Sequence, residues 1–243
     1  MAYSIPTIHV DVINESTVCT DAEIKHIMTN LQVQVSKHFF PAWGVDAYLT
    51  FIPRGGTPYT DHWWLSVLDD SDQAGALGYH DVTNAGLPLG KVFAKTDKTF
   101  GYLVSVTMSH ELLEMLVDPH INLTAQMNDG NFYAYEVADA CEADSLGYKI
   151  NDVVVSDFVW PAWFEGQITP GTRMDQMNHL AGPCPVLAPG GYIGYYDPRT
   201  GQWNQSTLRK GATERYLARP KVGSRRERRT IAIPDRIAST VKR

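Results

Sequence analysis

Three polar residues in the segment His110-Glu111-Leu112-Leu113-Glu114 have the types and spacing that metal-assisted chemistry requires. Residues four apart lie on one face of a helix, so the His110 imidazole and the Glu114 carboxylate can point at the same ion. Glu111 lies about 100° around the helix axis, close enough to reach a water on that ion. We therefore predict His110 and Glu114 as metal ligands and Glu111 as the catalytic base.

The residues around this segment are apolar, which indicates a buried helix in which polar side chains need a reason to be present. The apolar neighbours are Val104, Val106, Leu112, Leu113, Met115 and Leu116. The alternative is an exposed amphipathic helix whose carboxylates are simply solvated. The apolar surroundings favour the metal-binding interpretation.

The helix resembles the active-site helix of the zincin metallopeptidases, with a glutamate in place of the second histidine. The preceding strand–helix–strand order is similar to the N-terminal zincin subdomain, and the likeness covers residues 5–142. The stretch Gly75 to Asp81 falls where zincins place the edge strand that pairs with an extended peptide. The resemblance implies a hydrolase that cleaves peptide bonds, but no family within the superfamily is assigned.

The third metal ligand is predicted from the same resemblance. Glu136 follows Glu114 by 22 residues, and gluzincins use a downstream glutamate as the third ligand. Asp139 would then contact His110 from the second coordination shell. Its distance from Glu136 differs by one residue from the gluzincin spacing, so this role is less firmly implied.

Several other residues remain open as third ligands. His120 has the spacing of the third metzincin histidine, but Val117 stands where that family needs a glycine. Asp118 and Glu142 are further candidates, although Asp118 also suits a cap at the helix end.

One histidine and two carboxylates would make the site neutral with a divalent ion. We expect Zn²⁺, with Mn²⁺ or Ca²⁺ as alternatives because carboxylates favour harder ions. Candidate donors to a developing negative charge are Tyr133, Tyr135, Tyr148 and His179.

Apolar periodicity predicts the elements that position these residues. Strands are predicted over residues 5–13, 47–52 and 63–68, with shorter extended pieces over 75–81 and 91–94. A capping box at Thr20 and Glu23 opens a helix that should run to about Phe39. A second helix is predicted from about Thr99 to Val117, ended by Asp118-Pro119.

The predicted fold class is α+β: a zincin-like N-terminal mixed sheet carrying the active-site helix, followed by an irregular C-terminal half rich in Gly, Pro and aromatic residues. We expect one catalytic domain over residues 1–207, with subdomains over about 1–118 and 119–207. A basic tail follows over residues 208–243. Cys19, Cys141 and Cys184 are far apart and odd in number, which argues against a disulfide framework.

The net charge of −6 conceals an asymmetry, because the tail carries twelve Lys/Arg against three Asp/Glu and is therefore about +9. The rest of the chain is about −15. We expect the tail to dock on the acidic body or on a neighbouring subunit, and nucleic acid to be an improbable partner. The sequence has no secretory signal and no apolar run of membrane-spanning length, so we expect a cytoplasmic protein without a membrane partner.

Two functions remain open from the sequence. The first is a zinc metallopeptidase that acts on a peptide or protein substrate through Glu111. The second is a non-catalytic, zincin-like structural or assembly protein with a retained metal site, suggested by the glutamate at position 114 and by the Arg-rich tail.

Overall fold

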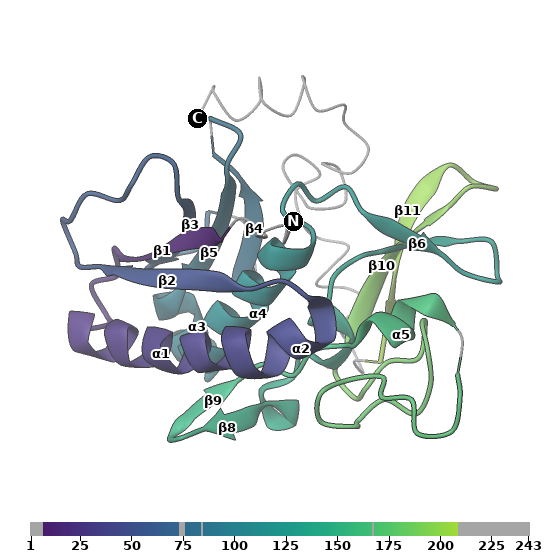
Figure 1. Ribbon diagram of the computed structural model, residues 1–243. Helices are drawn as coiled ribbons and strands as arrows, with labels where there is room; N and C mark the ends of the chain where they lie inside the picture. Colours follow the sequence, from purple (N-terminus) through teal and green to yellow (C-terminus); the bar gives the residue numbers. More distant parts are fainter. Residues whose placement is uncertain (1–6, 73–75, 84, 167, 209–243) are drawn as a thin grey trace, which may run out of the picture.

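The computed structural model describes residues 7–72, 76–83, 85–166 and 168–208, and these residues form a mixed α+β fold (Figure 1). The predicted fold class is confirmed at this level. The N-terminal half is built on a five-stranded sheet in the order β2-β1-β3-β5-β4. Its strands are β1 Ile8–Asn14, β2 Ala47–Ile52, β3 Trp63–Leu68, β4 Gly78–Val82 and β5 Pro88–Phe93.

The strands pair in parallel except for β4, which runs antiparallel to β5 at the edge of the sheet. The pairs Val12–Leu65 and Leu65–Gly90 fix the central register. The predicted strands over 47–52 and 63–68 are confirmed to the residue, and the first strand begins at Ile8. The two short extended pieces are the hairpin of β4 and β5.

The first helix, α1, spans Asp21–Val33 and begins as predicted, because the Thr20 side chain accepts a hydrogen bond from the Glu23 backbone N–H at 3.1 Å. The chain continues through a π-helical turn, Gln34–Phe39, into α2, Phe40–Trp43. Pro41 does not end the helix, because it lies in the first turn of α2, where no backbone donor is needed. The helical stretch ends at Gly44, which has a φ of 67°.

The prediction of one helix over 99–117 was wrong. Two helices, α3 Ala94–Phe100 and α4 Val104–Val117, are separated by Gly101, which adopts a φ of 78° and ends α3. Glycine takes this left-handed conformation at little cost, and it is a common helix terminator. The break separates α4, which carries His110, Glu111 and Glu114, from the strand-linked helix α3.

The C-terminal half contains more regular structure than expected. A four-stranded antiparallel sheet has the order β11-β10-β7-β6, with strands β6 Thr124–Gln126, β7 Phe132–Ala134, β10 Tyr192–Asp197 and β11 Gln202–Thr207. A hairpin of β8 Tyr148–Ile150 and β9 Val153–Val155 packs beside α4, and α5 spans Pro161–Glu165. The predicted irregular structure is found between α5 and β10. The basic tail lies outside the described residues, apart from Leu208.

One hydrophobic core runs through both halves. Helices α1 and α4 pack against the five-stranded sheet, and α4 also contacts β9 of the C-terminal half (Figure 1). Cys19, Cys141 and Cys184 are buried and unpaired, as expected from their number and spacing. Within the described ranges, no helix combines the length and the apolar character that crossing a bilayer would need.

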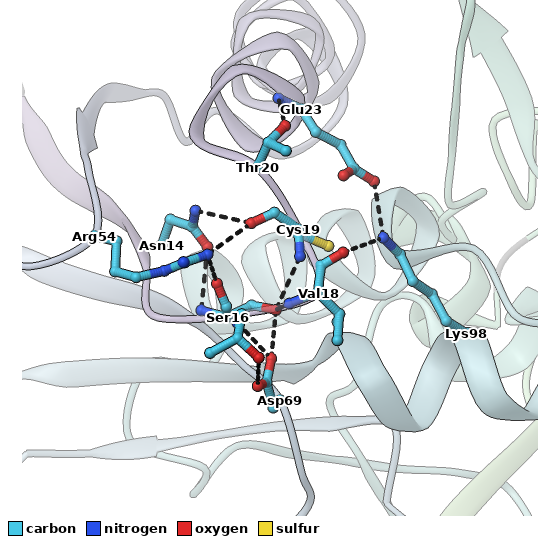
Figure 2. A network of polar contacts seen from close by, with 10 residues as sticks. Asn14, Ser16, Val18, Cys19, Thr20, Glu23, Arg54, Asp69 and Lys98 are labelled. Atoms are coloured by element: carbon cyan, nitrogen blue, oxygen red, sulfur yellow. Dashed lines mark hydrogen bonds and ion pairs between the residues drawn. The ribbon is translucent and has the colours of Figure 1, made fainter.

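The loop between β1 and α1 is held by a polar network at the carboxyl ends of the parallel strands (Figure 2). The Arg54 guanidinium donates to the backbone carbonyls of Ser16 and Cys19. The Ser16 hydroxyl donates to Asp69 at 2.6 Å. Slight burial would raise the pKa of Asp69, but hydrogen bonds from Ser16 and the next residue lower this pKa to about 2. The network fixes the start of α1 relative to β2 and β3.

Candidate metal centre

Helix α4 is enclosed on nearly all sides. Twelve of its fourteen residues are buried, between the strands β4 and β5 on one side and β9 on the other. A helix with solvated carboxylates would expose one face, so the alternative of an exposed amphipathic helix was wrong. His110, Glu111 and Glu114 are therefore placed in the interior, where a charged side chain is costly unless it is compensated.

His110 faces two carboxylates with a single ring nitrogen. Its Nε2 atom lies 3.2 Å from Glu114 Oε1 and 3.2 Å from Asp139 Oδ1. Burial alone would lower the pKa of His110, but the charge of Glu114 and the contacts with Asp139 and Glu114 raise it well above its usual range. The three side chains can present ligand atoms that all lie within 4.8 Å of one another.

These separations suit a small cation. Two ligands of a tetrahedral zinc ion with bonds of about 2.0–2.2 Å lie roughly 3.3–3.6 Å apart. The two separations at His110 are close to this range. An imidazole with two carboxylates is also a donor set that zinc accepts and that balances its charge. The residues present therefore fit a divalent metal ion.

A second histidine, His80 of β4, reaches the same helix from the sheet and is fully buried. Its Nδ1 atom lies 3.7 Å from Glu114 Oε2 and 3.8 Å from Glu111 Oε2. Its Nε2 atom lies 3.8 Å from Glu136 Oε2 and 3.2 Å from the backbone oxygen of Asp118. Glu114 thus belongs to two groups, one with His110 and Asp139 and one with His80 and Glu136.

The Glu111 side chain packs against two glycines of the sheet. A Cβ atom at Gly78 of β4 would come within 2.8 Å of Glu111 Cγ and 2.9 Å of Glu111 Oε1. A Cβ atom at Gly90 of β5 would lie 3.7 Å from Glu111 Cβ. The absence of a side chain at position 78 therefore makes room for the predicted base, which lies beside the edge strand.

The remaining predicted ligands are distributed differently from the gluzincin pattern. Glu136 lies with His80 and not in the group of His110, whereas Asp139 contacts the same His110 nitrogen as Glu114. Asp118 is fully buried and its carboxylate accepts backbone N–H groups of the following turn, at Asn122 and Leu123. It therefore caps the turn after α4, one of the two roles open from the sequence.

His120 is exposed in that turn and belongs to neither of the two groups. Two of the tyrosines considered as donors are engaged elsewhere. The Tyr133 hydroxyl donates to Asp129 at 2.7 Å, and the Tyr148 hydroxyl lies 3.1 Å from His38 Nδ1. His179 lies beside Asp157, in a separate group of donors.

His80 is the site residue that sequence reasoning missed. Its strand was assigned to substrate pairing, and a histidine within an extended stretch carries no spacing signal of the kind that a helix provides. The useful signal would have been its two-residue offset from Gly78, because alternate strand residues share a face. Both positions lie against Glu111.

Comparison with known proteins finds no family model, no curated protein and no solved structure that matches the chain.

Proposed function

We propose that the protein is a metal-dependent hydrolase of the zincin type that cleaves peptide bonds, with Glu111 as its general base. One observation carries the proposal: His110 Nε2 lies 3.2 Å from both Glu114 Oε1 and Asp139 Oδ1, close to the spacing of ligands around one small ion. We assign these three residues as the ligands and zinc as the metal. Mn²⁺ and Ca²⁺ remain the alternatives, because two of the three donors are carboxylates.

Asp139 replaces Glu136 as the third ligand in this proposal. A second-shell carboxylate would accept the proton of the other ring nitrogen of His110, Nδ1. Asp139 is instead placed at Nε2, the nitrogen that also faces Glu114. Glu136 then lies beside the His80 imidazole, which in turn faces the second carboxylate oxygen of Glu114, Oε2.

The arrangement of elements supports a zincin-like fold. The motif helix lies against a mixed sheet whose edge strand, β4, is antiparallel to its neighbour and contacts α4. An extended peptide can add to such an edge through backbone hydrogen bonds, which would bring it past Gly78 and Glu111. This supports a peptide or protein as the substrate class.

The chemistry can be divided among the chain's own residues. A bound zinc ion supplies Lewis-acid chemistry, which polarises the substrate carbonyl and makes a water more acidic. Glu111 accepts the proton of the attacking water and returns it to the leaving amine. His80, at 3.8 Å from Glu111 Oε2, helps to orient that carboxylate.

The test combines metal content with hydrolysis of a peptide library. The zinc-loaded wild-type chain should cleave members of the library. Glu111→Gln should keep its zinc and lose hydrolysis by roughly 10²–10⁴-fold, the usual contribution of a general base. His110→Ala should lose hydrolysis and the zinc bound at this centre. Glu165→Gln, a change at an exposed glutamate, is the matched control and should retain both.

Equal cleavage by Glu111→Gln and wild type would remove the catalytic claim. Zinc bound at His110 without cleavage of any peptide would favour the non-catalytic scaffold. Absence of metal from the wild-type chain, even after incubation with zinc, would contradict the proposed site itself.

A further inference from the structure

A second group of metal-type donors lies in the C-terminal half, apart from the centre on α4. It consists of Asp157, which follows β9, and Asp175 and His179, which lie in the irregular segment between α5 and β10. His179 Nδ1 lies 3.0 Å from Asp157 Oδ2 and 3.8 Å from Asp175 Oδ2. The three ligand atoms lie within 4.8 Å of one another.

The backbone holds the two carboxylates in a fixed orientation. Asp157 Oδ1 accepts the N–H groups of Phe158 at 2.8 Å and Met177 at 3.2 Å. Asp175 Oδ1 accepts the N–H of Leu180 at 2.9 Å. Asp175 Oδ2 also accepts the backbone N–H of His179 at 2.7 Å, whereas Asp157 Oδ2 faces the His179 imidazole. Donors held in this way are preorganised for a ligand.

A bound cation would balance the negative charge of the two buried carboxylates in this group. Asp157 and Asp175 are both fully buried, and burying two carboxylates side by side is costly unless they are compensated. Within the described part of the chain, the ion pairs of both carboxylates are made with His179 alone, whose side chain is 32% exposed. With both carboxylates ionised, one imidazolium leaves a net charge of −1, whereas a divalent cation with a neutral imidazole leaves none. Without a cation, burial and the neighbouring Asp175 raise the pKa of Asp157 to about 9, so the pair would hold a proton instead.

A cation bound by this group would have a structural role, because the group joins two segments of the chain. Between α5 and β10 the described residues contain no helix and no strand, and loops this long are uncommon in compact domains. An isolated bridge, Val159 to Asp175, and the bond from Trp163 Nε1 to the Val186 carbonyl at 3.0 Å fasten this segment. A cation held by Asp157 on one side and by Asp175 and His179 on the other would cross-link it to β9.

The group is distinct from the centre on α4. It shares no residue with the groups of His110 and His80. We propose that Asp157, Asp175 and His179 form a second divalent-cation site, with zinc as the preferred ion, that fastens the segment 168–191 to the body of the protein. Imidazole with two carboxylates suits Zn²⁺, and the exposed side of His179 leaves room for water as a fourth ligand.

The experiment counts zinc per chain after removal of metal, reconstitution with zinc and gel filtration. The wild-type chain should hold two equivalents. His179→Ala should hold one, His110→Ala should hold one, and the double variant none. Asp152→Asn is the matched control, because Asp152 also pairs with a histidine, His26 at 3.0 Å, but on the surface; it should hold two.

The counts separate the two sites. A wild-type chain with one zinc that is lost in His179→Ala would support the second site and contradict the first. Equal zinc content in His179→Ala and wild type would overturn the second site, whatever the outcome at His110. In that case the two buried carboxyl groups are neutralised by a shared proton and by His179 alone.

Two further measurements guard against a variant that misfolds. In the His110→Ala background, zinc should slow proteolytic cleavage within residues 168–191, and Asp157→Asn should abolish this protection. His179→Cys loaded with Co²⁺ should show the thiolate-to-metal charge-transfer absorption that the wild-type chain lacks. Protection that is independent of zinc, together with no charge-transfer band, would refute the proposal.

Discussion

Replacing Asp97 with asparagine should change how the stability of the protein depends on pH. Asp97 lies on α3, is fully buried and accepts a hydrogen bond from the Thr107 hydroxyl at 3.1 Å. Among the described residues, its Oδ2 atom has no hydrogen-bond partner. Burial raises its pKa to about 7, and the charges of Asp144 and Glu111 add to this, against the effect of Thr107.

The magnitude follows from the difference between a pKa of about 7 and the ordinary value of 3.8, which at about 1.36 kcal/mol per pH unit amounts to roughly 4 kcal/mol. The folded chain keeps a proton that the unfolded chain releases. The stability that protonated Asp97 contributes to the folded chain is therefore fully present below about pH 4, and it is lost as the pH rises to about 7. Asparagine resembles the protonated form, so Asp97→Asn should be more stable than wild type at pH 8 by up to this amount and similar at pH 4.

The assay is urea denaturation of wild type and Asp97→Asn at intervals from pH 4 to pH 8, with the free energy of unfolding compared at each pH. The difference between the two chains should grow up to about pH 7 and then stay level. The exposed substitution Asp152→Asn should give no such trend. A difference between wild type and Asp97→Asn that is constant across this range would refute the reasoning.

Three further predictions concern the site and its supports. Gly78→Ala should reduce hydrolysis by roughly 10²-fold with zinc content unchanged, because the added Cβ would lie 2.8 Å from Glu111 Cγ and displace the base; rates and metal analysis check this. Asp139→Asn should weaken zinc binding at least about tenfold more than Glu136→Gln, as measured by competition with a chelating dye. Arg54→Ala should lower the free energy of unfolding by about 1–2 kcal/mol in urea, because two bonds to backbone carbonyls are lost.

Each of these has a contrary outcome. Unchanged hydrolysis by Gly78→Ala would mean that Glu111 does not act from its position against β4. A larger loss of zinc in Glu136→Gln than in Asp139→Asn would restore Glu136 as the third ligand. Unaltered stability of Arg54→Ala would mean that the loop before α1 is held by its other contacts.

The sequence predicted the elements whose local signals agree with their surroundings. The strands over 47–52 and 63–68 are bounded by turn residues, and the capping box at Thr20 marks the start of α1. The boundary between α3 and α4 was missed because Gly101 lies inside an otherwise helical pattern, where glycine is tolerated. The paired strands β10 and β11 were missed because their burial is only partial, so their alternation is weak.

The candidate site could be predicted only where one element carries it. His110, Glu111 and Glu114 share a helix, so their spacing defines their geometry. The positions of His80 and Asp139 depend on the approach of β4 and of the turn Asp139–Cys141 to that helix, which no local pattern encodes. The same limitation applies to Asp157 and Asp175, which are separated along the chain and are brought together by an isolated bridge at Asp175.

The π-helical turn Gln34–Phe39 has a consequence for changes in chain length. Gln34 accepts a hydrogen bond from Ser109, the residue before His110, and donates to the Ser156 carbonyl. A π turn holds one more residue than an α-helix needs. Deleting a single residue there would let the turn close as ordinary helix and rotate Phe40–Trp43 by about 100° relative to α1. We therefore expect deletions in this turn to be rejected, whereas exposed loops such as Gly55–Gly56 should accept changes in length.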